Sequence, residues 1–223
     1  MRDSFKDHQL KASNPRNQFQ GFPIISDQVT REGLGVVWRE FERTLHHNIP
    51  GDVVEFGCYA GTSSLFIRRL LNNHNQSDTR AFHVYDSFEG LPEKSNQDNN
   101  AAGIDFEAGK LYVSKADFIK VFRAAGLQLP VIHKGWFGSI PQTEVPERIA
   151  AAFLDGDFYQ SIMDSLQLVW PRMSPGGIVL IDDYKRETLP GVERAINDYF
   201  GGNPPTQIRG EHNIAILTVP QPV

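Results

Sequence analysis

Hydrophobic positions along this chain follow two spacings, which predicts that helices and short buried strands alternate. From Gly33 to His47 the apolar residues recur every three or four positions, as on one face of an amphipathic helix. The run 53–56 is instead short, continuous and bounded by glycine, as in a strand buried on both faces. A capped helix over residues 62–71 follows, so this part of the chain predicts a strand, a glycine turn and a helix.

The same unit recurs along the rest of the chain. We expect further strands at 81–85, 129–133, 149–154 and 177–181, and helices at 114–125, 160–170 and 191–200. This alternation predicts an α/β fold with a mostly parallel, Rossmann-like sheet and helices on both faces. Residues 206–209 and 214–219 predict a C-terminal hairpin that closes one edge of the sheet.

Two polar segments lie outside this pattern. Residues 1–29 show no sustained period, and we interpret them as an N-terminal arm before one domain at 30–223. Residues 92–110 form a long polar insertion after the second strand, and loops of this length are usually lids or lack order. We therefore expect a lid near 92–110.

Composition narrows the classes of function. The net charge is −5 and the pI is about 5.8, which does not favour a nucleic-acid partner. Cys58 is the only cysteine, which excludes an intrachain disulfide and a cysteine zinc cluster and favours a cytoplasmic location. No run of about 18 apolar residues and no signal-peptide pattern occurs, so we expect no membrane association.

The turn after the first strand is a candidate ligand loop, since ligands bind outside the carboxyl ends of such strands. Gly57 and Gly61 allow the backbone to approach a ligand closely, and the following helix directs its free N–H groups there. The spacing G-x-x-x-G disfavours a nicotinamide dinucleotide. Glu55 suits a ligand with an ammonium and a carboxylate group, although a tight turn with a partly buried glutamate is an equal alternative.

Two further segments suggest a nucleoside. Asp86 ends the second strand, where an acid can accept hydrogen bonds from both ribose hydroxyls, although it could also cap a helix. Residues 134–137 follow the third strand and offer aromatic rings against which an adenine can stack. Trp136 taken alone is more often a packing residue.

Aspartates follow the fourth and fifth strands and predict a metal site. Asp155, Asp182 and Asp183 should meet at one edge of the sheet, where their mutual repulsion favours a divalent cation. Oxygen ligands without histidine or thiolate suit Mg²⁺, Mn²⁺ or Ca²⁺. Helix caps and a solvated loop are the structural alternative, but they explain three such residues poorly.

Four segments together resemble the macrocin O-methyltransferase family of S-adenosyl-L-methionine-dependent enzymes. They are GDVVEFGCYAGTSS, HVYDSFEGLPE, KGWFGSIPQT and FLDGDFYQSIMDSLQLVWPRMSPGGIVLIDDY, and the similarity runs from about Thr30 to Tyr199. The resemblance implies a seven-stranded methyltransferase sheet, one Mg²⁺ (or Mn²⁺) ion, and methylation of a sugar hydroxyl in natural-product biosynthesis. Relatives of this type form dimers or larger assemblies, so a homo-oligomer is open.

The resemblance also implies roles for individual residues. The methionine part of the cofactor would contact Glu55, Phe56, Gly57, Gly61, Thr62 and Ser63. Its ribose would contact Asp86 and Ser87, and its adenine would contact Gly135, Trp136 and Phe137. The cofactor would also contact Asp155. The metal would lie between Asp155, Asp182 and Asp183, and Asp157 would support Asp155 or exchange roles with it. A small hydroxylated acceptor, most simply a vicinal diol, would lose a proton to Asp155 or Asp157, with His133 and His212 as alternative bases.

Two other functions fit part of the pattern. Residues 155–157 read D-G-D, the motif with which a metal-dependent glycosyltransferase holds a nucleotide sugar, but this leaves the glycine loop and the second aspartate pair unexplained. A catalytically silent cofactor-binding module is the non-enzymatic alternative, which the intact set of aspartates does not favour.

Overall fold

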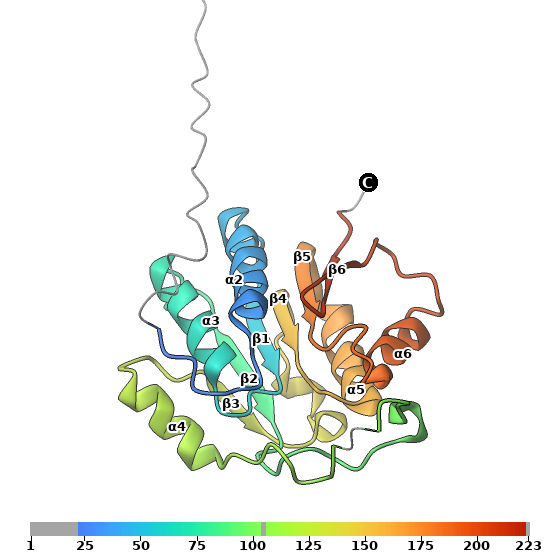
Figure 1. Ribbon diagram of the computed structural model, residues 1–223. Coiled ribbons are helices and arrows are strands. Elements are labelled where there is room, and N and C mark those ends of the chain that lie inside the picture. Colours follow the sequence, from blue (N-terminus) through green and yellow to red (C-terminus); the bar gives the residue numbers. More distant parts are fainter. Residues whose placement is uncertain (1–21, 104–105, 222–223) are drawn as a thin grey trace, which may run out of the picture.

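The computed structural model describes residues 22–103 and 106–221 and has a central sheet between two layers of helices (Figure 1). Within these residues the strand order is β3-β2-β1-β4-β5-β7-β6, with β7 antiparallel to both β5 and β6. The strands are β1 Asp52–Phe56, β2 Phe82–Asp86, β3 Val131–Lys134, β4 Ile149–Leu154, β5 Met173–Ile181, β6 Arg209–Glu211 and β7 Ile214–Thr218. The α-helices are α2 Arg31–His46, α3 Thr62–Asn73, α4 Lys115–Ala124, α5 Tyr159–Val169 and α6 Pro190–Tyr199. The predicted α/β fold, mostly parallel with a C-terminal hairpin, is confirmed.

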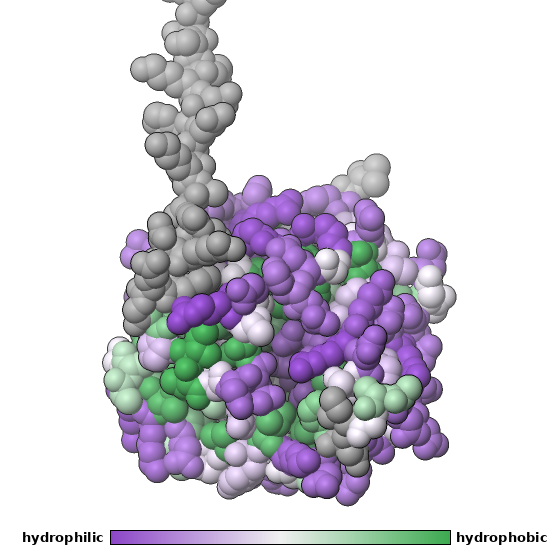
Figure 2. Space-filling view, viewed as in Figure 1, coloured by the Kyte–Doolittle hydropathy of each residue, from purple (hydrophilic) through white to green (hydrophobic). Residues whose placement is uncertain are grey.

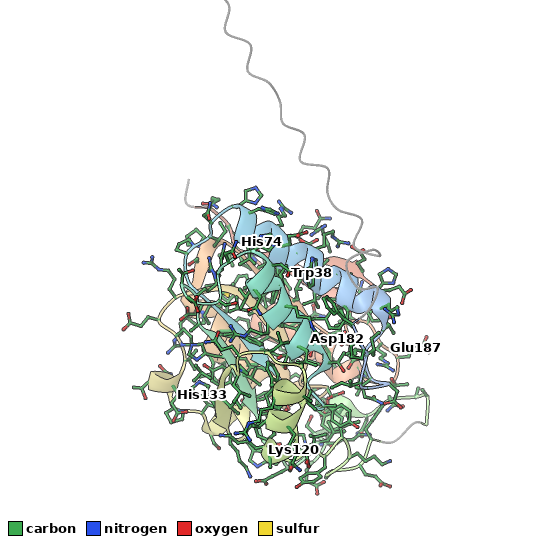
Figure 3. All side chains as sticks on the ribbon, turned by 90° about the vertical axis from the view of Figure 1, so that its left-hand side faces the viewer. Trp38, His74, Lys120, His133, Asp182 and Glu187 are labelled. Carbon is green, nitrogen blue, oxygen red and sulfur yellow. The ribbon has the colours of Figure 1, made fainter. Side chains whose placement is uncertain are left out.

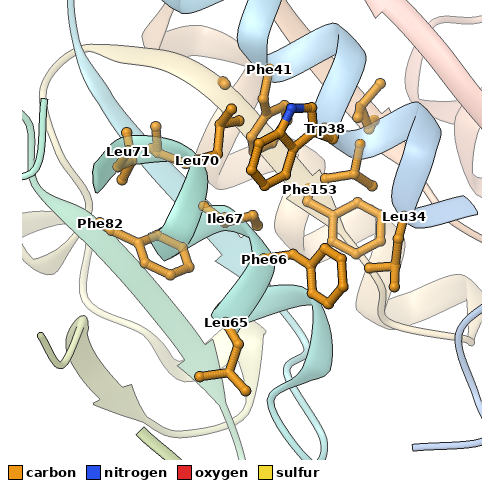
Figure 4. Packing of buried hydrophobic residues seen from close by; sticks show 14 of the residues in the cluster. Leu34, Trp38, Phe41, Leu65, Phe66, Ile67, Leu70, Leu71, Phe82 and Phe153 are labelled. Atoms are coloured by element: carbon orange, nitrogen blue, oxygen red, sulfur yellow. The ribbon is translucent and has the colours of Figure 1, made fainter. Parts of the chain in front are cut away.

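Each face of the sheet carries its own hydrophobic core. Alternate residues of a strand face opposite sides, so Val53 packs in the core beneath α2 and α3, while Val54 packs in the core beneath α5 and α6. Figure 4 shows the first core, where Trp38 and Phe41 of α2 meet α3 and Phe153 of β4. Figure 2 shows that the outer surface on one side of the molecule is mostly hydrophilic, as expected when the apolar side chains are used inside.

The start of α3 differs from the capped helix that the sequence predicts. Its N-cap is Gly61, in the left-handed region at φ 88°, and no side chain caps the first turn. A Cβ atom at Gly61 would lie 3.0 Å from the ring of Phe118, so glycine is needed here for both conformation and space. The free N–H groups of the first turn therefore have no side-chain cap among the described residues.

Two boundaries near the C-terminus also differ from the prediction. Strand β5 begins at Met173 rather than Gly177, because Met173 already pairs with Ile149 before a bulge in β5, where residues 173–178 lie opposite residues 149–151. The hairpin turn is His212–Asn213, with both residues at positive φ, and β6 begins only at Arg209. A two-residue turn of this kind sets the register of β6 against β7.

The polar insertion at 92–110 is fastened to the domain by Asp98, apart from residues 104–105, which lie outside the described residues. The buried Asp98 carboxylate accepts hydrogen bonds from the backbone N–H of Tyr159 at 2.7 Å and from Ser95 N at 2.9 Å. Gly191 makes room for it, since a Cβ there would lie 1.9 Å from Asp98 Oδ1. The insertion thus caps the start of α5, a contact that the sequence did not reveal.

The predicted N-terminal arm lies mostly outside the described residues, which begin at Phe22. Phe22 packs edge-on against Phe66 of α3 with ring centroids 5.9 Å apart, and the guanidinium of Arg69 lies over the Phe22 ring at 4.3 Å. This places the end of the arm against α3. Among the described helices none is long and apolar enough to cross a membrane.

Candidate active site

A cavity of about 290 Å³ lies at the carboxyl ends of the strands. It spans β1 and β4, the neighbouring strands at which the strand order changes direction, where open α/β sheets bind their ligands. Its wall includes loop residues after β1, β2, β4 and β5, and several residues of the 92–110 insertion. Among the residues predicted for the site, those that line it are Gly57, Asp86, Ser87, Trp136, Phe137, Asp155, Asp157, Asp182 and Asp183.

Three aspartates converge on one side of this cavity. Asp155, Asp157 and Asp183 each offer one carboxylate oxygen, and these oxygens all lie within 4.8 Å of one another. Asp182 borders the same cavity but is not a member of this group of three. The structure therefore brings together two of the three predicted metal ligands, Asp155 and Asp183, and the third member of the group is Asp157 rather than Asp182.

Burial and mutual repulsion disfavour the charged form of these carboxylates when no counterion is present. Loss of solvent raises the pKa of Asp155 and of Asp157 well above the usual range, and neighbouring aspartates raise both further. Burial, followed by the charge of Asp183, raises the pKa of Asp182 to about 7. A divalent cation would remove this repulsion, so the donor set fits a hard metal ion.

Arg186 supplies a positive charge on the same side of the cavity. Its Nη1 lies 2.6 Å from Oδ1 of the buried Asp183, and its charge opposes the rise in pKa at Asp157 and Asp182. Arg186 was not among the site residues predicted from the sequence. Its position three residues after the second aspartate pair is the only signal in the sequence that could have indicated it.

The backbone is in an uncommon conformation at several positions on the cavity wall. Tyr59, Asp157 and Asp183 have φ values of 43°, 59° and 55°, in the left-handed region that most residues avoid. Aspartate adopts this region more readily than most residues because its short side chain can hydrogen-bond locally. Such conformations cluster at functional sites, where the surrounding structure holds them.

The loop that contains Gly57 and Gly61 contacts the backbone of Asp155. Gly57 has φ 87°, and a Cβ atom there would lie 1.9 Å from the backbone oxygen of Asp155. Glu55 lies beneath the loop, fully buried, where the hydroxyl of Ser64 donates a hydrogen bond to it and burial raises its pKa to about 7. Glu55, Phe56, Gly61 and Thr62 do not line the cavity, and Ser63 lines an adjoining one.

Asp86 joins the second strand to the glycine loop. Its Oδ2 accepts hydrogen bonds from the backbone N–H groups of Cys58 at 2.9 Å and Tyr59 at 3.3 Å, and its Oδ1 accepts one from Phe88 N at 2.7 Å. A carboxylate has about four acceptor positions, so little capacity remains for two ribose hydroxyls. The neighbouring Ser87 hydroxyl accepts from Glu89 N and donates to the carbonyl of Gly90.

Aromatic side chains form another part of the cavity wall. Trp136 and Phe137 both line the cavity, and Phe137 packs edge-on against Phe56 at 5.2 Å between ring centroids. Gly135 does not line it, but its N–H donates to the carbonyl of Asp86 at 2.9 Å and so fixes the loop. The predicted adenine segment therefore reaches the cavity through two of its three residues.

The two histidines considered as bases lie in different places. His133 is on β3, where its ring nitrogens lie 3.1 Å from His83 and 2.9 Å from Glu144, and it does not line the cavity. His212 lines an adjoining cavity of about 300 Å³, whose wall shares Gln28, Asp182, Asp183 and Arg186 with the first. Cys58 is buried, and burial raises the pKa of its thiol well above the usual range, which disfavours the nucleophilic thiolate form.

Comparison with known proteins establishes the family. A family model described as "Macrocin-O-methyltransferase (TylF)" matches residues 7–204 of this chain. The chain belongs to this family. The match begins well before Thr30, so the resemblance extends into the N-terminal segment that the sequence motifs left unplaced.

Individual relatives agree with this membership. The chain is 36% identical over 166 residues, 72% of its length and 62% of the relative's, to the 8-demethyl-8-(2,3-dimethoxy-alpha-L-rhamnosyl)-tetracenomycin-C 4'-O-methyltransferase of Streptomyces olivaceus. It is 34% identical over 165 residues, 71% of its length and 63% of the relative's, to the mycinamicin III 3''-O-methyltransferase of Micromonospora griseorubida. The chain thus spans a little less than two thirds of these curated relatives.

Solved structures share the fold. The O-methyltransferase NovP superposes with a TM-score of 0.74 at 24% identity, covering 86% of this chain and 81% of that one. The methyltransferase PaMTH1 of Podospora anserina, in a structure bound to S-adenosylhomocysteine, superposes with a TM-score of 0.57 at 14% identity, covering 93% and 86%. The predicted seven-stranded methyltransferase sheet is confirmed by these matches.

Proposed function

We propose that this chain is an S-adenosyl-L-methionine-dependent O-methyltransferase that acts on a sugar hydroxyl of a natural product with the help of a divalent metal ion. The observation that carries the proposal is the convergence of Asp155, Asp157 and Asp183 beside a cavity that also has a glycine loop and an aromatic wall. Family membership and the named activities of the relatives support the same reaction.

The nucleoside of the methyl donor would occupy the side of the cavity formed by β1, β2 and the 135–137 loop. Trp136 and Phe137 offer ring surfaces for adenine, and the Gly57 backbone allows the methionine part to approach closely. Asp86 holds the loop in shape through Cys58 N and Tyr59 N. The donor supplies a methyl group on a sulfonium, a good leaving group, so the protein mainly has to align the acceptor oxygen.

The metal ion would be held by Asp155, Asp157 and Asp183, with Asp182 as the nearest alternative ligand. The burial and close spacing of these carboxylates support a hard cation, preferably Mg²⁺, because such a charge cluster is otherwise unfavourable. When bound, the ion supplies Lewis-acid chemistry that makes a nearby hydroxyl more acidic. A carboxylate oxygen of Asp155 or Asp157 would accept the hydroxyl proton.

The acceptor would lie where the two adjoining cavities meet, at Asp182, Asp183 and Arg186. Among the described residues, carboxylates of the first cavity greatly outnumber its single guanidinium, that of Arg186. This charge balance favours a neutral or cationic acceptor over a phosphorylated one, because an anion would be repelled. A sugar diol fits this surface. The described end of the N-terminal segment reaches the same place through Gln28.

Calorimetric titration with Mg²⁺ tests the metal site and distinguishes the two candidate ligand sets. The metal-stripped protein should bind one Mg²⁺, and Asp155→Asn, Asp157→Asn and Asp183→Asn should each weaken binding about tenfold or more. Asp182→Asn should have a smaller effect if the group of three in the structure holds the ion. Equal loss in Asp182→Asn and none in Asp157→Asn would favour the set predicted from sequence. Unchanged Mg²⁺ binding in all four variants would mean that other residues hold the ion, and unchanged turnover after chelation would exclude a role for the metal in the reaction.

Ligand specificity separates the proposed reaction from the alternatives. S-adenosylhomocysteine should bind in the absence of metal, and a UDP-sugar should not bind with or without Mg²⁺. Preferential binding of the UDP-sugar would support a glycosyltransferase. Binding of both S-adenosylmethionine and Mg²⁺ without transfer to any sugar diol would support a catalytically silent module.

A further inference from the structure

A second group of metal-ligating side chains lies outside the proposed active site. Glu42 and His46 are on α2, and His74 directly follows α3. One ligand atom from each of the three lies within 4.8 Å of the other two. His74 Nε2 is 3.2 Å from Glu42 Oε1, and the rings of His46 and His74 meet edge-on with centroids 4.8 Å apart. Two imidazoles and one carboxylate therefore converge on one point.

The chemistry of this group differs from that of the aspartate cluster. Two imidazole nitrogens and one carboxylate oxygen form a donor set that suits Zn²⁺, whereas oxygen ligands alone suit Mg²⁺. The side chains of Glu42 and His74 are 23% and 18% exposed and His46 is exposed, so an ion there could complete its shell with water. The two sites should therefore select different metals.

The helices position these ligands before any metal binds. Glu42 and His46 are four residues apart, so they project from the same face of α2 one turn from each other. The backbone N–H of His74 is hydrogen-bonded to the carbonyl of Leu70, which fixes the residue at the end of α3. The two helices pack through buried residues such as Phe41 and Leu70 (Figure 4). The backbone of all three ligands is therefore held in place, so metal binding would mainly have to order their side chains.

The local electrostatics also favour a cation. His46 lies in the last turn of α2, and His74 is the C-cap of α3, so the negative ends of two helix dipoles face the group. The carboxylate of Glu42 adds a full negative charge. These three contributions act in the same direction.

We propose that Glu42, His46 and His74 form a Zn²⁺ site that joins the C-terminal end of α2 to that of α3. The site lies at the end of the sheet opposite the cavity, because α3 starts at the cavity loop and runs away from it to His74. In Figure 3, His74 is at one end of α3 and Asp182 lies near the other. The ion would stabilise the packing of α2 on α3 without contacting the reacting groups.

The test is a Zn²⁺ titration of the full chain after chelator treatment, with Asp183→Asn as the background to weaken competition from the aspartate cluster. We expect one site with a Kd of about 10 µM or tighter, and a Zn²⁺-dependent rise in Tm. His46→Ala and His74→Ala should each weaken Zn²⁺ binding about tenfold or more and abolish this rise. His47→Ala is the matched control, because His47 is exposed, adjacent in sequence and outside the group, and it should bind as the background does.

Two further measurements distinguish the loss of a ligand from misfolding. His46→Gln should melt within a few degrees of the background without metal yet lack the Zn²⁺ response. Co²⁺ should give visible absorption bands in the background protein that are absent in His74→Ala. Equal Zn²⁺ affinity in the background, His46→Ala and His74→Ala would overturn the proposal and leave Glu42 and His74 as a hydrogen-bonded pair only. Millimolar binding in every protein would mean adventitious surface binding and would also overturn it.

Discussion

The guanidinium of Arg186 lies 2.6 Å from the carboxylate of Asp183, so one cation already faces the group of aspartates without a metal. Arg186→Gln should lower the free energy of unfolding of the metal-free protein by about 1 kcal/mol, or about 2–4 °C in Tm, because a buried carboxylate loses its partner. The rise in Tm on adding Mg²⁺ should then be larger than in the wild type. Thermal unfolding in EDTA and in Mg²⁺ measures both effects.

Arg186→Lys is the control for charge, and its Mg²⁺ response should lie between those of the wild type and Arg186→Gln. Lysine keeps the positive charge but cannot reproduce the planar donor geometry of arginine. A Mg²⁺ response in Arg186→Gln equal to or below that of the wild type would contradict the view that arginine and metal neutralise the same carboxylate.

The buried Glu55 predicts a specific dependence of stability on pH. Burial raises its pKa to about 7, so between about pH 4.5 and 7 the folded state binds more protons at Glu55 than the unfolded state does. The free energy of unfolding therefore falls as pH rises through this range. Between pH 5.5 and 8.0 the contribution of Glu55 to this fall should be about 2 kcal/mol. Urea unfolding in EDTA at both pH values measures it.

Glu55→Gln isolates this contribution, because glutamine stays neutral at every pH. The loss of stability between pH 5.5 and 8.0 should be smaller in the variant than in the wild type, while the aspartates of the cavity contribute equally to both. S-adenosylhomocysteine affinity should change less than about threefold, since Glu55 lies beneath the loop. A loss of about tenfold or more would instead mean that Glu55 contacts the methionine part, as the sequence predicts.

Asp86 is expected to affect donor binding through the shape of the loop. Asp86→Asn removes one acceptor oxygen near Cys58 N and Tyr59 N, so S-adenosylhomocysteine should bind about tenfold more weakly. The wild type and the variant can also be compared with a 2′,3′-dideoxy analogue of the ligand. If Asp86 binds the ribose directly, the variant will no longer distinguish the two ligands. Equal discrimination in both proteins would restrict Asp86 to its role in the loop.

The docking of the 92–110 insertion depends on Asp98. Asp98→Ala leaves Tyr159 N and Ser95 N without their acceptor, so the free energy of unfolding should fall by about 2 kcal/mol and Tm by about 4–8 °C. Limited proteolysis within the insertion should become faster. Gly191→Ala should have a similar effect, because the added Cβ would overlap Asp98 Oδ1.

Asp98→Asn is the milder control, since its amide oxygen can still accept from Tyr159 N. Its Tm should lie between those of the wild type and Asp98→Ala. If Asp98→Ala is cleaved no faster than the wild type, the insertion is held by other contacts. The contact from Asn100 Nδ2 to the carbonyl of Thr188, 3.2 Å long, would then be the next to test.

The sequence predicts the strands and helices well because their periodicity is local. Strand β4 at Ile149–Leu154 has the bounds predicted, and the other elements differ by a few residues at their ends. The start of β5 could not be predicted, because its first residues pair with β4 only through a bulge. The docking of Asp98 was equally hidden, since it depends on the absence of a side chain at Gly191, far away in the sequence.

For the site, sequence predicts which loops meet but not which side chains reach the cavity. The carboxyl ends of β4 and β5 bring the aspartates together, but the left-handed backbone at Asp157 and Asp183 determines which carboxylates converge. The ion pair of Arg186 also depends on the turn after β5, which no periodic pattern describes. The sequence makes Glu55 a candidate ligand of the cofactor. In the structure Glu55 is buried beneath the loop, because α3 covers it and Ser64 of that helix donates a hydrogen bond to it.

The contact between Gly57 and the main chain of Asp155 has a consequence for how such a site can vary. Because these two backbones touch, peptide groups rather than side chains fix the distance between the loop after β1, where the methyl donor would bind, and the aspartates after β4. A family member with any larger residue at this position would have to move two neighbouring strands apart. Variation in acceptor choice is therefore expected in the surrounding loops, while the spacing of the two halves stays constant.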